Sequence, residues 1–120
     1  MHDAKTVDDA LPLTARVFLI LWALADKPQH AYGLLAEVER RGSGRVTIKP
    51  GSLYEAIYTL EERGLVATSE EHAPPTDRRR GRTFALTELG RAVLTAEAER
   101  LGQLVEELRT TDLLSSQEQG

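Results

Sequence analysis

The stretch from residue 49 to residue 64 limits the fold of this chain more than any other segment. Pro50 and Gly51 predict a turn, because proline fixes φ and glycine accepts unusual backbone angles. Ser52 follows where a helix needs an N-cap, and three apolar residues then recur at helical spacing: Leu53, Ile57 and Leu60. A basic residue and a glycine close the stretch, as is typical of a helix C-terminus. We therefore expect a short capped helix with one face held against a core.

The opposite face of this expected helix carries polar side chains. At 100° per residue, Glu55, Tyr58 and Thr59 lie away from the apolar face, with Tyr54 on its flank. Lys49 stands at the entry, where a cation and a helix N-terminus can both meet a phosphate. The pattern fits a recognition helix for DNA and a purely structural helix equally well. The two tyrosines either pack on the flank of the core or contact DNA.

Two short segments with strand character follow this helix. Residues 65–69 contain β-branched side chains, and residues 82–87 alternate with period two. The loop between them, residues 70–81, contains two consecutive prolines and cannot be a central strand. Upstream, the sequence predicts two further helices over residues 13–25 and 30–41. Three helices followed by a two-stranded hairpin predict a mainly α fold with a small β-hairpin, a winged helix-turn-helix whose wing is the hairpin.

The formal net charge of −4 argues against nucleic acid, but the charges are unevenly distributed. Residues 40–54 carry four basic residues and no acidic one, whereas residues 88–120 hold three Arg against seven Asp or Glu. Such asymmetry can build a local positive surface on an acidic protein. Residues 78–87 again carry four basic residues and no acidic one. We expect these wing arginines to neutralise DNA phosphates rather than only face solvent: Arg78, Arg79, Arg80 and Arg82.

The last element is a long helix with a heptad pattern. It runs from about Glu88 to Arg109, with Thr87 as the expected N-cap. At 1.5 Å per residue it would be roughly 33 Å long, more than a domain of this size needs to cover its own core. A seam with alternating spacings of four and three residues indicates pairing with another helix: Leu94, Ala98, Leu101, Val105 and Leu108. We therefore expect a homodimer held by this seam together with the first helix.

The segment 13–25 is apolar nearly all round, so its helix must be buried on most of its surface. In so small a chain, that burial suggests a helix shared between a core and a second subunit. Thr14 is its expected cap, and a proline soon after the segment stops it. Trp22, the only tryptophan, is either a packing residue or, with Phe18, the wall of an effector pocket between subunits.

The sequence holds no set of residues arranged for catalysis or metal binding. It has no cysteine, its three histidines do not cluster, and it has no phosphate-binding glycine loop, so we expect no enzyme activity, metal or cofactor. No apolar run reaches the ~18 residues of a membrane span. Because the polar start also lacks the features of a signal peptide, we expect a cytoplasmic protein with no membrane partner. Its 120 residues suggest a DNA-binding unit (13–87) and a dimerisation helix (88–110) between mobile tails (1–12 and 111–120).

Several of these stretches, in this order, resemble the PadR-type (phenolic acid decarboxylase repressor) family of transcriptional regulators. Pro-Gly-Ser-Leu-Tyr at 50–54 and Leu-Thr-Glu-Leu-Gly at 86–90 are the most specific, and His-Ala-Tyr-Gly-Leu at 30–34 supports them. The resemblance covers roughly residues 13–108 and is strongest to the smaller members, which have a single helix after the wing. It implies a homodimeric repressor that binds operator DNA and often releases it on binding a small molecule. The DNA contacts would then come from the wing arginines and from Lys49, Pro50, Gly51, Ser52, Tyr54 and Tyr58.

The chain departs from the family pattern at three places. Members commonly have proline where this chain has Glu55, whose carboxylate either accepts from a cytosine amino group or points away from DNA. The run 80–84 has one aromatic residue fewer than members usually carry there, and the helix over 87–109 has none, which argues against binding of flat aromatic drugs. A winged helix used for protein–protein assembly is the alternative function. The basic segments at the third helix and the wing favour DNA binding.

Overall fold

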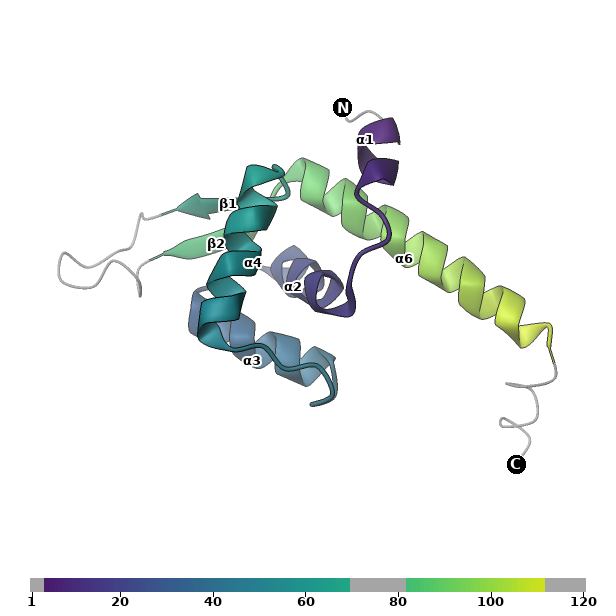
Figure 1. Ribbon diagram of the computed structural model, residues 1–120, viewed down its shortest axis with the longest axis horizontal. Helices are drawn as coiled ribbons and strands as arrows, with labels where there is room; N and C mark the ends of the chain where they lie inside the picture. Colours follow the sequence, from purple (N-terminus) through teal and green to yellow (C-terminus); the bar gives the residue numbers. More distant parts are fainter. Residues whose placement is uncertain (1–3, 70–81, 112–120) are drawn as a thin grey trace.

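The computed structural model describes residues 4–69 and 82–111, and its elements follow the predicted order (Figure 1). The fold is mainly helical, with one two-stranded antiparallel sheet and a long C-terminal helix, as the sequence predicts. The elements are, in chain order, α1 (Ala4–Asp9), α2 (Ala15–Asp26), α3 (Ala31–Arg41), α4 (Pro50–Glu62), β1 (Val66–Ser69), β2 (Thr83–Leu86) and α6 (Glu88–Arg109).

Two threonines cap helices, as predicted. Thr14 Oγ1 accepts from the N–H of Val17 at the start of α2 (3.1 Å), and Thr87 Oγ1 accepts from the N–H of Gly90 at the start of α6 (2.9 Å). Each bond satisfies a backbone donor that has no partner within its own helix. The hydroxyl of Thr87 also donates to the carbonyl of Gly64 at 2.6 Å, which ties the start of α6 to the end of α4.

Helix α4 begins earlier than expected, so the prediction of Ser52 as its N-cap is wrong. The N-cap is Lys49, and Pro50 occupies the first helical position. Proline is favoured there because its fixed φ suits the helix and the position needs no N–H donor. No side chain caps this end of α4, and Ser52 lies half-buried within the first turn.

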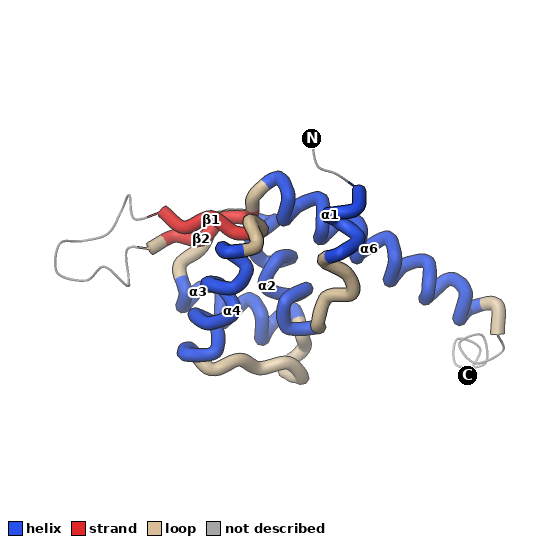
Figure 2. Tube along the Cα trace, turned by 45° about the horizontal axis from the view of Figure 1, so that its top comes forward, coloured by secondary structure: helices blue, strands red, loops and turns tan. Residues whose placement is uncertain are grey.

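The hairpin is joined to the helices through the turn before α3. Strands β1 and β2 pair antiparallel, with Val66 opposite Leu86. The N–H of Gln29 donates to the carbonyl of Phe84 (3.0 Å), and the N–H of Phe84 donates to the carbonyl of Gln29 (2.8 Å). Figure 2 shows both strands at one side of the helical unit. The base of the wing is therefore fixed to the helix-turn-helix by backbone hydrogen bonds.

One core joins α2, α3 and α4 to the hairpin and to α6. Its fully buried side chains come from all these elements: Ile20, Leu21, Leu34, Val38, Leu53, Ile57, Leu60, Phe84 and Val93. The three apolar residues predicted to face the core from α4 are among them. Gly90 allows helix α6 to lie close to the backbone of Leu65. Any larger residue at this position would place a side chain against the carbonyl of Leu65. The long helix is thus packed firmly against the unit at its N-terminal end.

The N-terminal segment differs from the predicted tail over residues 1–12. Within it, Ala4–Asp9 form α1, which packs against α6 (Figure 1). The N–H of Leu13 donates to Glu97 Oε2 at 2.7 Å, and Arg100 donates to the same buried carboxylate at 3.0 Å. The Arg100 guanidinium and, to a lesser extent, the Leu13 N–H hold the pKa of Glu97 below its usual range. Contacts between residues so far apart in the chain give no periodic pattern in the sequence.

Candidate nucleic-acid interface

Helix α4 and the start of β2 bring together most of the described residues that were predicted to contact DNA. The backbone entering α4, residues 49–51, is exposed, and Ser52 is half-buried behind it. Tyr58 lies further along the same helix, with 44% of its surface exposed. Arg82, next to the first residue of β2, donates from Nη1 to the hydroxyl oxygen of Tyr58 at 3.3 Å. The outer face of α4 at Tyr58 therefore lies beside the base of the wing.

Tyr54 takes a position closer to the core than Tyr58 does. It is half-buried, and its ring meets that of Phe84 edge-on with centroids 6.4 Å apart. The rings of Tyr54 and Tyr58 are 6.3 Å apart. Tyr54 thus packs on the flank of the core, between the rings of Phe84 and Tyr58. A contact between Tyr54 and DNA stays a prediction.

The wing arginines are only partly within the described structure. Arg78, Arg79 and Arg80 lie outside the described residues, whereas Arg82 is described and half-buried. The carbonyl oxygen of Arg82 lies 2.8 Å from Nδ1 of His30. His30 occupies the N-cap position of α3, but its side chain makes no capping hydrogen bond. Its contact with the wing spans 52 residues of sequence and could not be read from local pattern.

The basic residues that end α3 are engaged in ion pairs. Arg40 Nε lies 2.7 Å from Glu37, and Arg41 lies 3.3 Å from Asp26 with its guanidinium 4.7 Å from the centre of the Trp22 ring. The hydrogen bond from Arg40 lowers the pKa of Glu37 to about 2, with a further contribution from Arg41. These arginines therefore have structural partners, and Lys49 is the exposed cation nearest the start of α4.

Glu55 lines a shallow crevice of about 290 Å³ between α2 and α4. Ser52, Thr59 and two cations, Arg16 and Arg63, share this crevice. Sequence reasoning missed Arg16, because nothing in the pattern of α2 indicates which residues of α4 it faces. One carboxylate and two guanidinium groups thus share one crevice, so the charges that line it do not sum to a negative value.

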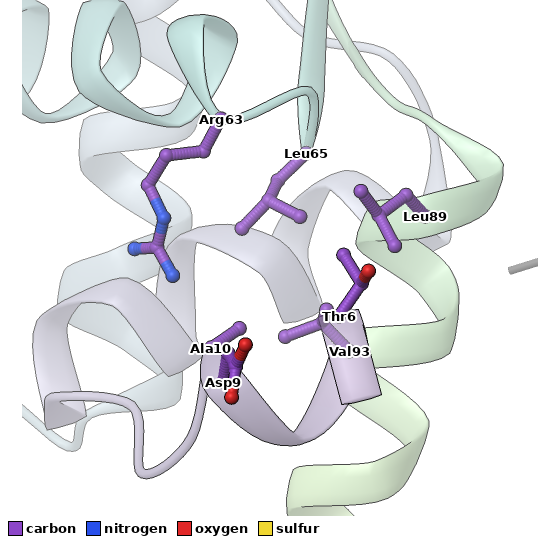
Figure 3. Close-up of a pocket in the computed structure, with 7 residues that line it drawn as sticks. All are labelled: Thr6, Asp9, Ala10, Arg63, Leu65, Leu89 and Val93. Atoms are coloured by element: carbon purple, nitrogen blue, oxygen red, sulfur yellow. The ribbon is translucent and has the colours of Figure 1, made fainter. Parts of the chain in front are cut away.

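A second crevice, of about 250 Å³, lies where α1, the end of α4 and the start of α6 meet (Figure 3). The side chain of Arg63 extends toward Asp9 and Ala10 of the α1 region, and Leu65 and Val93 also line the crevice. At 100° per residue, Arg63 is about 140° around the helix from Tyr58. Arg63 thus belongs to the crevices beside α4 and not to the face that carries Tyr58.

The two residues predicted to form an effector pocket lie in one apolar crevice. Phe18 and Trp22 have ring centroids 6.4 Å apart, and Trp22 is 42% exposed. The crevice has a volume of about 430 Å³. Its other wall is formed by α6, through Leu94, Thr95, Ala98 and Glu99. Two of these, Leu94 and Ala98, are members of the predicted dimer seam, so the crevice is continuous with that seam.

The rest of the seam lies on the part of α6 that projects from the molecule (Figure 1). Leu101, Val105 and Leu108 are 37%, 45% and 41% exposed, respectively. Leu104, which sequence reasoning did not include, is 48% exposed and follows Leu101 by three residues. A single chain leaves this apolar stripe in water, which is unusual for a monomer.

Residues 4–69 and 82–111 contain no cluster of His, Asp or Glu that could hold a metal ion. In the same part of the chain, no helix is both long and apolar enough to cross a membrane.

Three helices, a two-stranded wing and a projecting terminal helix define a winged helix-turn-helix protein of the kind found among transcriptional regulators. The pattern of the transcriptional regulator PadR-like family matches residues 20–96, more than half of the chain. Transcriptional regulator Rv3488 from Mycobacterium tuberculosis is 33% identical over 89 residues, covering 74% of this chain and 78% of that protein. The chain belongs to the PadR-like family of transcriptional regulators, a class distinct from enzymes.

Two further comparisons found a relative in sequence and a neighbour in fold. A 37.1 kDa protein in transposon TN4556 of Streptomyces fradiae is 41% identical over 86 residues, which is 72% of this chain. The chain spans only 23% of that relative's length. A PadR family transcription regulator from Clostridium difficile has a TM-score of 0.65 at 18% identity, covering 81% of this chain and 97% of that one. This last likeness is one of fold.

Proposed function

We propose that this protein is a homodimeric repressor that binds a palindromic operator in the cytoplasm and releases it when a small molecule binds. The observation that carries the proposal is the exposed surface of α4. Its entry carries Lys49 and an uncapped first turn, and its outer face carries Tyr58, which contacts Arg82 of the wing. A winged helix-turn-helix inserts such a helix into the major groove, which is wide enough to admit it.

The start of α4 supports a phosphate contact. Pro50 has no N–H, and the N–H of Leu53 already donates to the carbonyl of Lys49 at 2.9 Å. The N–H groups of Gly51 and Ser52 have no acceptor within the helix, and no side chain caps this end. A DNA phosphate would accept hydrogen bonds from these two N–H groups. The positive end of the helix dipole and the side chain of Lys49 would attract the same phosphate.

The apolar seam of α6 supports a two-fold assembly. Pairing two copies would remove Leu101, Leu104, Val105 and Leu108 from water, which is favourable in proportion to the apolar area buried. A symmetric dimer presents two copies of α4. Its operator should therefore be a palindrome whose half-sites lie about one helical turn, ~34–36 Å, apart or a multiple of it.

The crevice formed by Phe18 and Trp22 supports an effector site at the same interface. Its walls belong to α2 and α6, and two of its residues, Leu94 and Ala98, are seam residues. A small apolar molecule bound there would contact the interface directly. It could therefore change the distance between the two recognition helices and release DNA.

A winged helix used only for protein–protein assembly is the alternative function. A gel-shift experiment with the DNA upstream of the protein's own gene, run at two salt concentrations, separates the two. A repressor shifts this DNA with an affinity that falls as salt rises. An assembly module leaves the DNA unshifted at both concentrations.

The wing is expected to act through phosphates. Replacing Arg80 and Arg82 together by alanine should weaken binding to both operator and non-operator DNA, and should reduce the log–log salt slope by up to ~2 units. A fluorescence-anisotropy titration at several salt concentrations measures both effects. Arg91→Ala combined with Arg109→Ala is the matched control, because it removes the same charge from α6 instead. An unchanged slope with an altered operator preference would show that these arginines read bases.

A further inference from the structure

Arg82 joins three parts of the proposed DNA interface. Its carbonyl oxygen lies 2.8 Å from Nδ1 of His30, at the start of α3. A carbonyl can only accept, so Nδ1 carries the proton of this hydrogen bond. The guanidinium of the same arginine donates to the hydroxyl oxygen of Tyr58 on α4 at 3.3 Å. A continuous link therefore runs from α3 through the base of the wing to the outer face of α4.

The link is distinct from the contacts that hold the base of the wing from the core side. There, Gln29 and Phe84 exchange two backbone hydrogen bonds, and Gln29 Nε2 donates to the carbonyl of Ala23 at 2.8 Å. Tyr54 meets the buried Phe84 ring edge-on. These contacts hold β2 on its core side, where its pairing with β1 and the hydrogen bond from Thr87 to Gly64 also hold it. The His30–Arg82–Tyr58 link adds contacts on the exposed side, at the end of β2 that leads into the wing loop.

We propose that His30 and Arg82 are positioning residues that fix the wing against α4 and thereby set the discrimination between operator and non-operator DNA. The proposal rests on the DNA-binding function proposed above. Phosphate contacts place a protein on the duplex, whereas base contacts carry sequence information. If the wing and α4 move as one unit, phosphates held by the wing keep Tyr58 at one register in the groove. If they move separately, phosphates are bound at any register, and non-operator DNA competes better.

Three replacements of His30 test the link without changing any charge of the wing. His30→Ala removes the donor, and it loses no cap because the side chain makes no capping bond. His30→Asn restores an N–H at nearly the position of Nδ1, whereas His30→Gln carries its N–H one bond further out. Each variant is titrated with the tightest duplex selected from a randomised library and with a scrambled duplex of equal length.

We expect His30→Ala to lower the ratio of the two affinities by about 3- to 10-fold, the effect of losing one hydrogen bond. Affinity for the scrambled duplex should change by less than about 2-fold, since no phosphate contact is removed. His30→Asn should recover most of the ratio and His30→Gln little of it. Combining His30→Ala with Tyr58→Phe should cost less than the sum of the two, because either change breaks the same link.

Nitrogen-15 NMR of the protein without DNA tests the contact itself. At a pH where the imidazole is neutral, His30 should be the Nδ1–H tautomer, and Tyr58→Phe should alter its signals. An Nε2–H tautomer, an equal loss on both duplexes in His30→Ala, or His30→Asn behaving like His30→Ala would each overturn the proposal. A wild-type protein without preference for any selected duplex would instead refute the DNA-binding function, and with it the role assigned to this link.

Discussion

Replacing Leu101 by glutamate is expected to leave the protein monomeric at concentrations where we expect the wild-type protein to form the proposed dimer. Leu101 lies in the middle of the seam and is 37% exposed in the single chain, so pairing would bury it against the second copy. A carboxylate at this position would lose its hydration without gaining a partner, which costs several kcal/mol in each subunit. Val105→Glu should have the same effect one turn further along. Sedimentation velocity measures the oligomeric state directly.

The matched control for this experiment is Gln103→Glu. Gln103 is exposed on the same helix and lies about 200° around it from Leu101, so the added charge faces water in the dimer as well. The control should sediment as the wild-type dimer. A far-UV circular dichroism spectrum of Leu101→Glu should retain its helical content, which would show that loss of the dimer is not loss of folding. A Leu101→Glu protein that stays dimeric would exclude this seam as the interface.

The second large effect is expected at the recognition helix. The triple replacement of Lys49, Ser52 and Tyr58 by alanine should lower operator affinity by on the order of 100-fold or more, because the loss occurs at both half-sites of a dimer. Lys49→Ala and Ser52→Ala alone should weaken binding to all DNA, since their contacts are with phosphates. Because Ser52 is not the N-cap of α4, its replacement by alanine removes no capping bond. Any loss of affinity then reports on DNA contact rather than on helix stability.

Discrimination should depend on a different pair of residues. Glu55→Ala or Tyr58→Ala should change the preference at one base pair of each half-site by ~1–3 kcal/mol. Arg63→Ala is the control, because Arg63 is the C-cap of α4 and its side chain extends toward the α1 region (Figure 3), about 140° around the helix from Tyr58. It should leave the operator preference unchanged. Full operator binding by the triple variant would show that α4 is not the reader.

Sequence patterns predicted the elements whose stability is local. The apolar spacing of α4, the caps Thr14 and Thr87 and the period-two strand β2 all depend on residues within a few positions of one another. Local signals failed where two of them competed. Both Pro50 and Ser52 are suited to a helix start, and the preference of proline for the first helical position prevailed.

The remaining features depend on contacts between residues distant in the chain. Helix α1 has only six residues, too few to be stable alone, and it lies against α6 through a segment that Glu97 anchors at Leu13. The half-exposed ring of Trp22 reflects the position of α6, not the composition of α2. The bond between His30 and Arg82 likewise depends on how the hairpin returns to α3. None of these could be predicted from spacing along the sequence.

A hydroxyl-radical footprint on the selected operator is the most direct test of the proposed function. A symmetric dimer with one α4 in each major groove predicts two protected regions related by a two-fold axis. Their centres should lie ~34–36 Å apart along the duplex or at a multiple of that distance. The triple variant at Lys49, Ser52 and Tyr58 should give no protection under the same conditions. A single protected region, a pattern without two-fold symmetry, or equal protection by the triple variant would contradict the account.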